Sequence, residues 1–181
     1  GWEFYTQTHH DAQALWQHLK QAGKPFGLDI FGLDSMHIRR IEAGILNAGS
    51  DFDHTTTPFD VGLGMFVDQD KGDFIGKHAL KNASKHSRLI GILCKAEPHI
   101  GAEIRIDGNT VGKVTAGAMS PYLKQGVGIA LMFDSGNLPE TQVSIGCIDG
   151  KFYEGQLATL PLYDKAGEIQ RGKKVAIPLR D

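Results

Sequence analysis

The chain has 181 residues, of which 41% are hydrophobic, 22% charged and 8% aromatic, as in an ordinary soluble globular protein. Its 19 Lys and Arg residues nearly balance its 21 Asp and Glu residues, so no basic field favours nucleic acid or an anionic membrane as a partner. The longest apolar run, Val127–Phe133, is far shorter than the roughly 18 residues of a membrane span. We therefore expect a cytoplasmic protein that does not cross a membrane.

The first 84 residues mix helical and strand-like patterns. Apolar residues at helical spacing, with Asp11 placed as the N-cap, predict the first helix, and Gly44 marks the end of the second. Helices are predicted over 11–23, about 31–41 and 77–80, and strands over 3–6 and 62–67. This part is therefore expected to be an α+β segment and part of a larger split domain.

From residue 85 onward the pattern is entirely β. Short runs rich in Val, Ile and Leu alternate with turn residues, and Asp149-Gly150 predicts a two-residue hairpin turn. Strands are predicted over 88–94, 102–106, 111–118, 127–133, 142–148 and 152–159. We expect an α+β protein with two domains: a partial α+β domain over 1–84 and a small all-β barrel over 85–181, joined by a linker at 82–87.

The metal-ligating and thiol residues show no recognisable site pattern. Cys94 and Cys147 lie far apart in apolar stretches, which excludes a disulfide framework and predicts two reduced thiols in the core. The eight histidines include no H-E-x-x-H or H-x-H spacing, and His9 and His10 are predicted to be solvated at the start of a helix. We predict no metal site.

Four segments carry a resemblance to a known family. Residues 32–44 read G-L-D-S-M-H-I-R-R-I-E-A-G, and residues 57–67 read T-P-F-D-V-G-L-G-M-F-V. Residues 71–80 read K-G-D-F-I-G-K-H-A-L, and residues 111–121 read V-G-K-V-T-A-G-A-M-S-P. In this order they resemble the L-R-L-E-A-G, T-P-x-E-x-G-L, K-x-D-F-I-G-K-x-A-L and V-G-x-V-T-S-G-x-x-S-P motifs of the glycine-cleavage T-protein (aminomethyltransferase) family. The sequence of residues 62–68 and 162–164 is more similar to that of the branch that contains dimethylglycine and sarcosine dehydrogenases and folate-dependent demethylases.

The resemblance implies tetrahydrofolate as the cofactor and assigns three residues to its binding. Glu3, at the family's F-E glutamate, would accept hydrogen bonds from pterin N–H groups; the alternative is an exposed glutamate. Arg40, at the L-R-L-E arginine, would donate a planar pair of N–H groups, although the same helix also offers Arg39. Arg88 would reach the glutamate tail of folate; the alternative is an ordinary surface arginine. Glu42 would either pair with an arginine or contact the ligand directly.

The resemblance also implies that this chain is the C-terminal part of a longer protein. Family members are about twice as long, and the chain opens without Met on residues that match the end of a family motif. The carboxylate that acts on folate and amine would precede Gly1, so we assign no catalytic residue and expect the chain by itself to be inactive.

Two functions follow from this reading. The first is a folate-dependent aminomethyltransferase or demethylase whose one-carbon donor is a methylated small molecule or the aminomethyl group of a lipoyl carrier protein. The alternative is a non-catalytic folate-binding or scaffold module, which the lack of a Trp near Met65 favours because T-proteins commonly have one there.

Overall fold

The computed structural model describes residues 2–134, 136, 138–169 and 171–173, which form an α+β protein with a closed barrel. By its internal contacts the chain divides into two compact units, Gly1–Leu33 and Asp34–Asp181. None of the helices in the described part of the chain is both long and apolar enough to cross a membrane.

The first unit consists of helix α1 (His9–Gly23) and the short 3-10 helix η1 (Lys24–Phe26). The cap of α1 is Thr8 rather than Asp11, because Thr8 has extended backbone and its hydroxyl accepts the Asp11 N–H at 3.2 Å. The predicted strand over 3–6 is not formed. A strand needs a partner for its backbone groups, and no described strand pairs with this segment. No described residue of this unit is buried.

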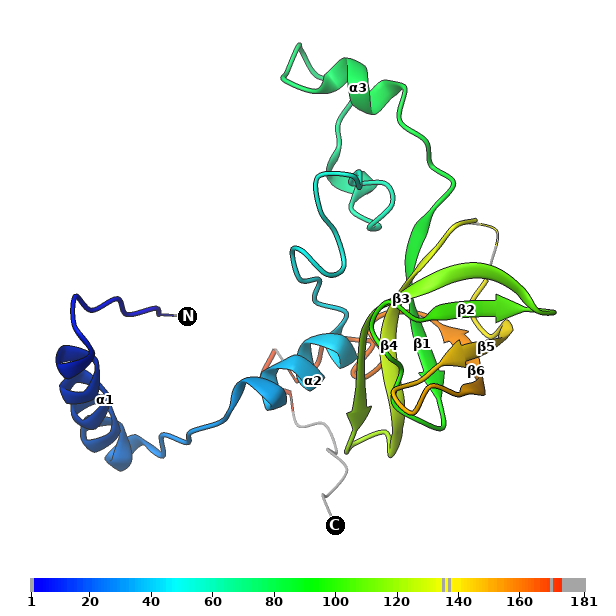
Figure 1. Cartoon of the computed structure of the whole chain (residues 1–181). Coiled ribbons are helices and arrows are strands. Elements are labelled where there is room, and N and C mark those ends of the chain that lie inside the picture. The colour runs from blue at the N-terminus through cyan, green and yellow to red at the C-terminus, as the bar shows by residue number, and fades with distance from the viewer. Residues whose placement is uncertain (1, 135, 137, 170, 174–181) are drawn as a thin grey trace. The chain divides into compact units, whose positions relative to one another are not determined.

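Six antiparallel strands close the barrel of the second unit in the order β1-β4-β3-β2-β5-β6 (Figure 1). The alternation of apolar residues places one face of each strand in the interior. The strands are β1 (Arg88–Cys94), β2 (Glu103–Ile106), β3 (Asn109–Ser120), β4 (Gln125–Met132), β5 (Gln142–Gly146) and β6 (Phe152–Ala158). The predicted fold class and small barrel are thereby confirmed.

The predicted two-residue turn at Asp149-Gly150 is a longer loop. The hairpin itself is present, and the ladder between β5 and β6 ends at the pair Gly146 and Phe152. Beyond it, the Cys147 N–H donates to the Lys151 carbonyl at 2.9 Å, and the Gly150 N–H donates to the Cys147 carbonyl at 3.0 Å, so three residues form the loop.

A β-bulge in β3 changes which face of the strand is buried in the barrel. The register with β4 shifts between Val114 and Ala116, so that Thr115 has no paired residue in the ladder between these two strands. Val114 packs in the barrel interior, whereas Ala116, two positions later, packs on the outer face. The bulge thereby turns Thr115 towards the polar site described below.

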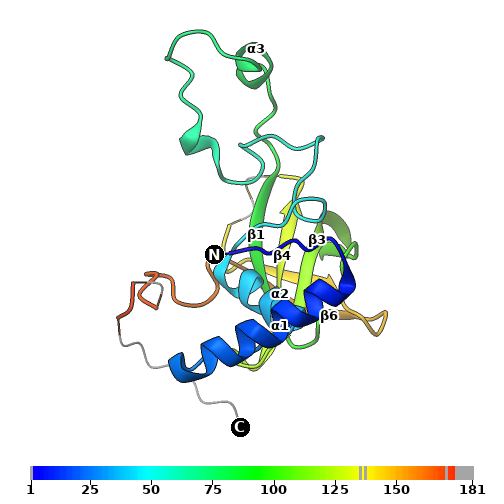
Figure 2. The ribbon, with the colours of Figure 1, turned by 90° about the vertical axis from the view of Figure 1, so that its left-hand side faces the viewer.

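Helix α2 (Leu33–Ala43) packs on the outside of the barrel, as Figures 1 and 2 show. Its residue Ile41 is fully buried against the outer face of β3 and β4. The helix ends at Gly44, whose φ of +69° is a left-handed conformation that favours glycine. This outer core consists of Ile41, Ala116, Ala118, Val127 and Ile129.

The connection from α2 to β1 contains η2 (Gly64–Phe66) and α3 (Lys77–Lys81). The strand predicted over 62–67 is instead the 3-10 turn of η2, since this segment also has no partner strand among the described residues. Buried Asp60 fastens the connection to the barrel: it accepts the Ser87 hydroxyl at 2.5 Å, and its carbonyl accepts the Leu89 N–H at 2.7 Å. The predicted domain boundary at 84/85 stays a prediction.

Candidate functional site

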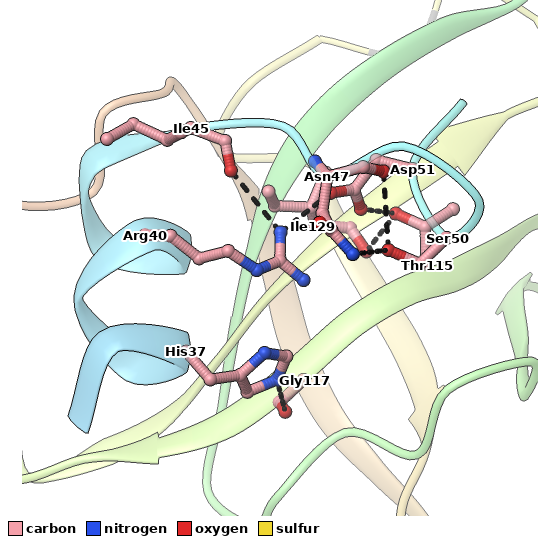
Figure 3. A network of polar contacts seen from close by, with 9 residues as sticks. All are labelled: His37, Arg40, Ile45, Asn47, Ser50, Asp51, Thr115, Gly117 and Ile129. Carbon is pink, nitrogen blue, oxygen red and sulfur yellow. Dashed lines mark hydrogen bonds and ion pairs between the residues drawn. The ribbon is translucent and has the colours of Figure 1, made fainter. Parts of the chain in front are cut away.

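A cluster of hydrogen-bonded polar side chains lies where α2 and the loop after it meet β3. Arg40 Nη1 donates to Asp51 Oδ2 at 2.7 Å and to the Ile45 carbonyl oxygen at 3.3 Å (Figure 3). The side chain of Asp51 is fully buried, and that of Arg40 is 13% exposed. Arg40 thus neutralises a buried carboxylate.

Two further hydrogen bonds hold the Asp51 carboxylate. Its Oδ2 also accepts the Asn47 N–H at 2.8 Å, which closes the loop after α2. Its Oδ1 accepts the hydroxyl of Thr115, the bulge residue of β3, at 2.7 Å (Figure 3). The bulge is therefore the backbone feature that brings a barrel hydroxyl onto the carboxylate that pairs with Arg40.

The neighbouring arginine makes a second, separate arrangement. Arg39 Nη1 lies 2.5 Å from Glu42 Oε2, and its guanidinium stacks 4.2 Å from the ring centre of Tyr122. The other carboxylate oxygen of Glu42, a buried residue, accepts the Ser120 hydroxyl at 2.6 Å. The Glu42 carbonyl accepts the N–H groups of residues 162 and 163, which fastens the segment after β6 to α2.

A cavity of about 300 Å³ lies between α2 and the segment after β6. Arg39 and Arg40 are among its lining residues, and the hydroxyl of Tyr163, another lining residue, is buried with no hydrogen-bond partner among the described residues. A buried hydroxyl without a partner is unfavourable in a folded protein. The lining residues are Met36, Arg39, Arg40, Glu42, Ala43, Ile45, Pro161, Tyr163, Asp164 and Ile169.

Comparison with known families identifies both parts of the chain. A family model described as "GCVT N-terminal domain" matches residues 1–71. A second model, "Glycine cleavage T-protein C-terminal barrel domain", matches residues 88–164. The chain belongs to the glycine cleavage T-protein family. The barrel match spans all six strands.

Curated relatives of this T-protein-family chain are aminomethyltransferases. That of Caldanaerobacter subterraneus subsp. tengcongensis is 39% identical over 73% of this chain and 36% of its own length. That of Clostridium botulinum strain Okra is 35% identical over 88% of this chain and 47% of its own length. The chain thus spans less than half the length of these relatives.

A solved T-protein structure shares the fold. The crystal structure of glycine cleavage system aminomethyltransferase T from Bartonella henselae matches with a TM-score of 0.71 and 23% identity. The match covers 86% of this chain and 45% of the solved chain. It supports the architecture described above.

The residues predicted to bind folate lie in different surroundings in this T-protein-family chain. Glu3 is exposed in the first unit, where its carboxylate accepts the hydroxyl of Tyr5. Arg40 borders the cavity of the second unit, while Arg88 is half-buried and begins β1. The structure thus shows one of the three at the cavity, and the folate contacts of all three stay predictions.

The alternative that Glu42 pairs with an arginine is confirmed by its contact with Arg39, but sequence reasoning missed Asp51, the partner of Arg40, and the two hydroxyls that bind these carboxylates. Asp51, Thr115 and Ser120 are not part of any catalytic pattern, and the last two lie in a strand otherwise read as apolar. The polarity of Thr115 and Ser120 within the segment over 111–121 was the available signal, because a hydroxyl in a buried strand needs a hydrogen-bond partner.

Proposed function

We propose that the natural protein containing this chain transfers a one-carbon unit to tetrahydrofolate, and that this chain supplies part of the folate site. The observation that supports it is the cavity beside α2. In a T-protein-family chain, that cavity combines two arginine side chains with a buried tyrosine hydroxyl that has no partner among the described residues.

The chemistry of the cavity fits one portion of tetrahydrofolate. The molecule joins a flat ring system with polar edges to a negatively charged glutamate tail. Met36, Ile45 and Pro161 offer apolar surface to a ring, and Arg40 offers N–H donors on Nε and Nη2 besides the Nη1 that binds Asp51. A volume of about 300 Å³ is at the lower end for a whole drug-sized ligand, so the cavity is suited to one portion of the folate.

Folate contacts are also proposed for the other two residues that the family motifs mark. Glu3 would accept the pterin's amino and ring N–H groups, because two carboxylate oxygens suit an edge with two donors. Arg88 would pair with the glutamate tail. Neither role is derived from the geometry of the cavity, and both rest on the family motifs that these positions match.

The bound folate would supply the nitrogen that accepts the carbon, and the protein would supply position. Holding the acceptor against the donor converts a bimolecular step into one within a complex, which is a large part of the proposed rate acceleration. We propose as donor a methylated small molecule or an aminomethyl group on a lipoyl carrier protein. The assisting carboxylate would lie outside this chain, so the chain alone is expected to show no turnover with folate and a donor.

Calorimetric titration of tetrahydrofolate into the longest natural protein that contains this chain tests the proposal. We expect measurable binding, and Arg40→Lys should weaken it by roughly 10- to 150-fold, since a charge-assisted hydrogen bond contributes about 1.5–3 kcal/mol. Arg105→Lys is the matched control, because Arg105 forms an exposed ion pair with Glu103 and does not line this cavity. It should leave the affinity for tetrahydrofolate unchanged.

Because Arg40 also holds Asp51, the melting temperature of each variant is measured beside its affinity, and binding is compared well below the lower melting temperature. No heat at millimolar folate contradicts the proposal. Binding without turnover on any methylated donor or aminomethyl carrier would favour the non-catalytic module instead.

A further inference from the structure

The two cysteines of the chain meet inside the barrel, although 53 positions separate them. Cys94 ends β1 and Cys147 directly follows β5, and their Sγ atoms lie 3.8 Å apart. Both side chains belong to the interior core, with 4% and 3% of their surface exposed. The spacing in the sequence gave no indication of this contact.

A glycine in the intervening strand leaves room for the Cys94 side chain. β6 pairs with both β1 and β5, and its Gly155 lies opposite Cys94. A Cβ atom at Gly155 would lie 2.8 Å from the Cys94 Cβ and 2.6 Å from the Ile145 Cδ1. The absence of a side chain at Gly155 therefore leaves room for the interior side chains of Cys94 and Ile145.

One of the two cysteines is among the residues that line a surface cavity, although its side chain belongs to the interior core. A cavity of about 380 Å³ is lined by Cys94 together with polar side chains that include Lys95 and Gln142. Cys147 does not line it. Burial raises the pKa of both thiols, that of Cys147 to about 12, so both react slowly and Cys147 is the weaker nucleophile towards an oxidant from solution.

We propose that Cys94 and Cys147 are a modification site that forms a reversible disulfide with a small oxidant of the peroxide class. The Cys94 sulfur takes one peroxide oxygen and becomes a sulfenic acid, while its proton leaves with the other oxygen as water. The Cys147 sulfur then attacks the Cys94 sulfur, and the departing hydroxide takes the Cys147 proton as a second water. Two thiols lose two electrons and two protons, and one peroxide becomes two water molecules.

The geometry favours this bond over further oxidation of Cys94. Closing the sulfur–sulfur distance from 3.8 Å to the roughly 2.05 Å of a disulfide needs a small local repacking, and the second thiol is already in contact. The bond would join β1 to the end of β5 across β6. It would therefore restrict the unfolded chain and raise the melting temperature of the barrel.

The test exposes the full chain to hydrogen peroxide and follows it by intact mass and by peptide mapping without reduction. Oxidation of exposed Met65 reports the progress of the reaction at the surface. Oxidation of fully buried Met132 reports that the core has opened. We expect a cross-linked peptide containing Cys94 and Cys147 after Met65 is oxidised and before Met132 is. Both thiols should be lost together, with a higher melting temperature that dithiothreitol reverses.

Cys94→Ala and Cys147→Ala are the matched controls, and each should show no cross-linked peptide and no rise in melting temperature. The proposal is overturned if both thiols stay free once Met65 is fully oxidised. It is equally overturned if Cys94 proceeds to a sulfinic acid without the cross-link. A cross-link that appears only together with Met132 oxidation would belong to the unfolded chain and would also overturn it.

Discussion

Arg39 and Arg40 are adjacent in the sequence, yet each neutralises a different buried carboxylate. Successive residues of a helix point about 100° apart, so one arginine turns to Glu42 and the other to Asp51. Both side chains also border the cavity. Any change at either arginine is therefore expected to act on folding as well as on the proposed folate binding, a coupling that the motif alone does not reveal.

Removing the Arg40 charge should destabilise the fold. Arg40→Met leaves the fully buried Asp51 carboxylate without a cation, so we expect the free energy of unfolding to fall by about 3–5 kcal/mol in urea denaturation. Lys151→Met, which removes an exposed partner 4.0 Å from Asp149, should change it by less than about 1 kcal/mol. Adding Asp51→Asn to Arg40→Met should recover part of the loss. Equal effects of Arg40→Met and Lys151→Met would show that the buried ion pair between Arg40 and Asp51 contributes no more to stability than an exposed one.

Protonation of Asp60 should lower the stability of the fold at acid pH. Burial acts to raise the pKa of its carboxyl, but hydrogen bonds from Ser87 and Thr57 outweigh it and hold the pKa below its ordinary value. A carboxyl with a depressed folded pKa contributes stability above its unfolded pKa of about 3.9, and this stability is lost as pH falls through the folded pKa. We expect the melting temperature to drop as pH is lowered below about 4, and Asp60→Asn to drop less over the same range. A parallel decline in both proteins would contradict this assignment.

At the scale of elements, the close packing of segment 95–98 on the barrel depends on glycine. A Cβ atom at Gly117 in β3 would lie 2.0 Å from the Pro98 carbonyl oxygen, far inside any allowed contact. Gly117→Ala should therefore cost about 3 kcal/mol of unfolding free energy, the upper end of the usual range for overpacking, measured by denaturant titration. Gly72→Ala, where nothing lies within 4 Å of the new Cβ, should be nearly neutral. A mild effect at Gly117 would mean that the segment can move away from β3.

The elements that the sequence predicts well are those whose pattern is local. The helices over 9–23 and 33–43 and all six barrel strands follow from periodicity and lie within a few residues of their predicted bounds. The strands over 3–6 and 62–67 failed because a strand exists only with a partner, which periodicity does not supply. The bulge at Thr115 and its contact with Asp51 join positions 64 apart, so no local pattern indicates them.

At the scale of the whole molecule, burial is confined to the second unit. No described residue over 2–33 is buried, whereas the barrel holds a continuous interior core and α2 covers a second one. Trp2, Tyr5 and Phe26 each leave at least 87% of their surface exposed. Apolar surface that stays in water contributes nothing to stability, so the first unit has little to hold it folded by itself.

Amide hydrogen exchange should separate the two units. A 15-residue helix without buried contacts is marginal in water, so peptides from α1 should exchange through frequent local opening. Peptides from β4 and β5 open only with the whole barrel and should be protected up to the global free energy of unfolding. Mass spectrometry of the exchanging chain should show α1 fully exchanged before β4 has begun, and Thr8→Ala should leave the β4 rate unchanged. If α1 is protected as strongly as β4, the helix is packed against a core that its exposed side chains do not reveal.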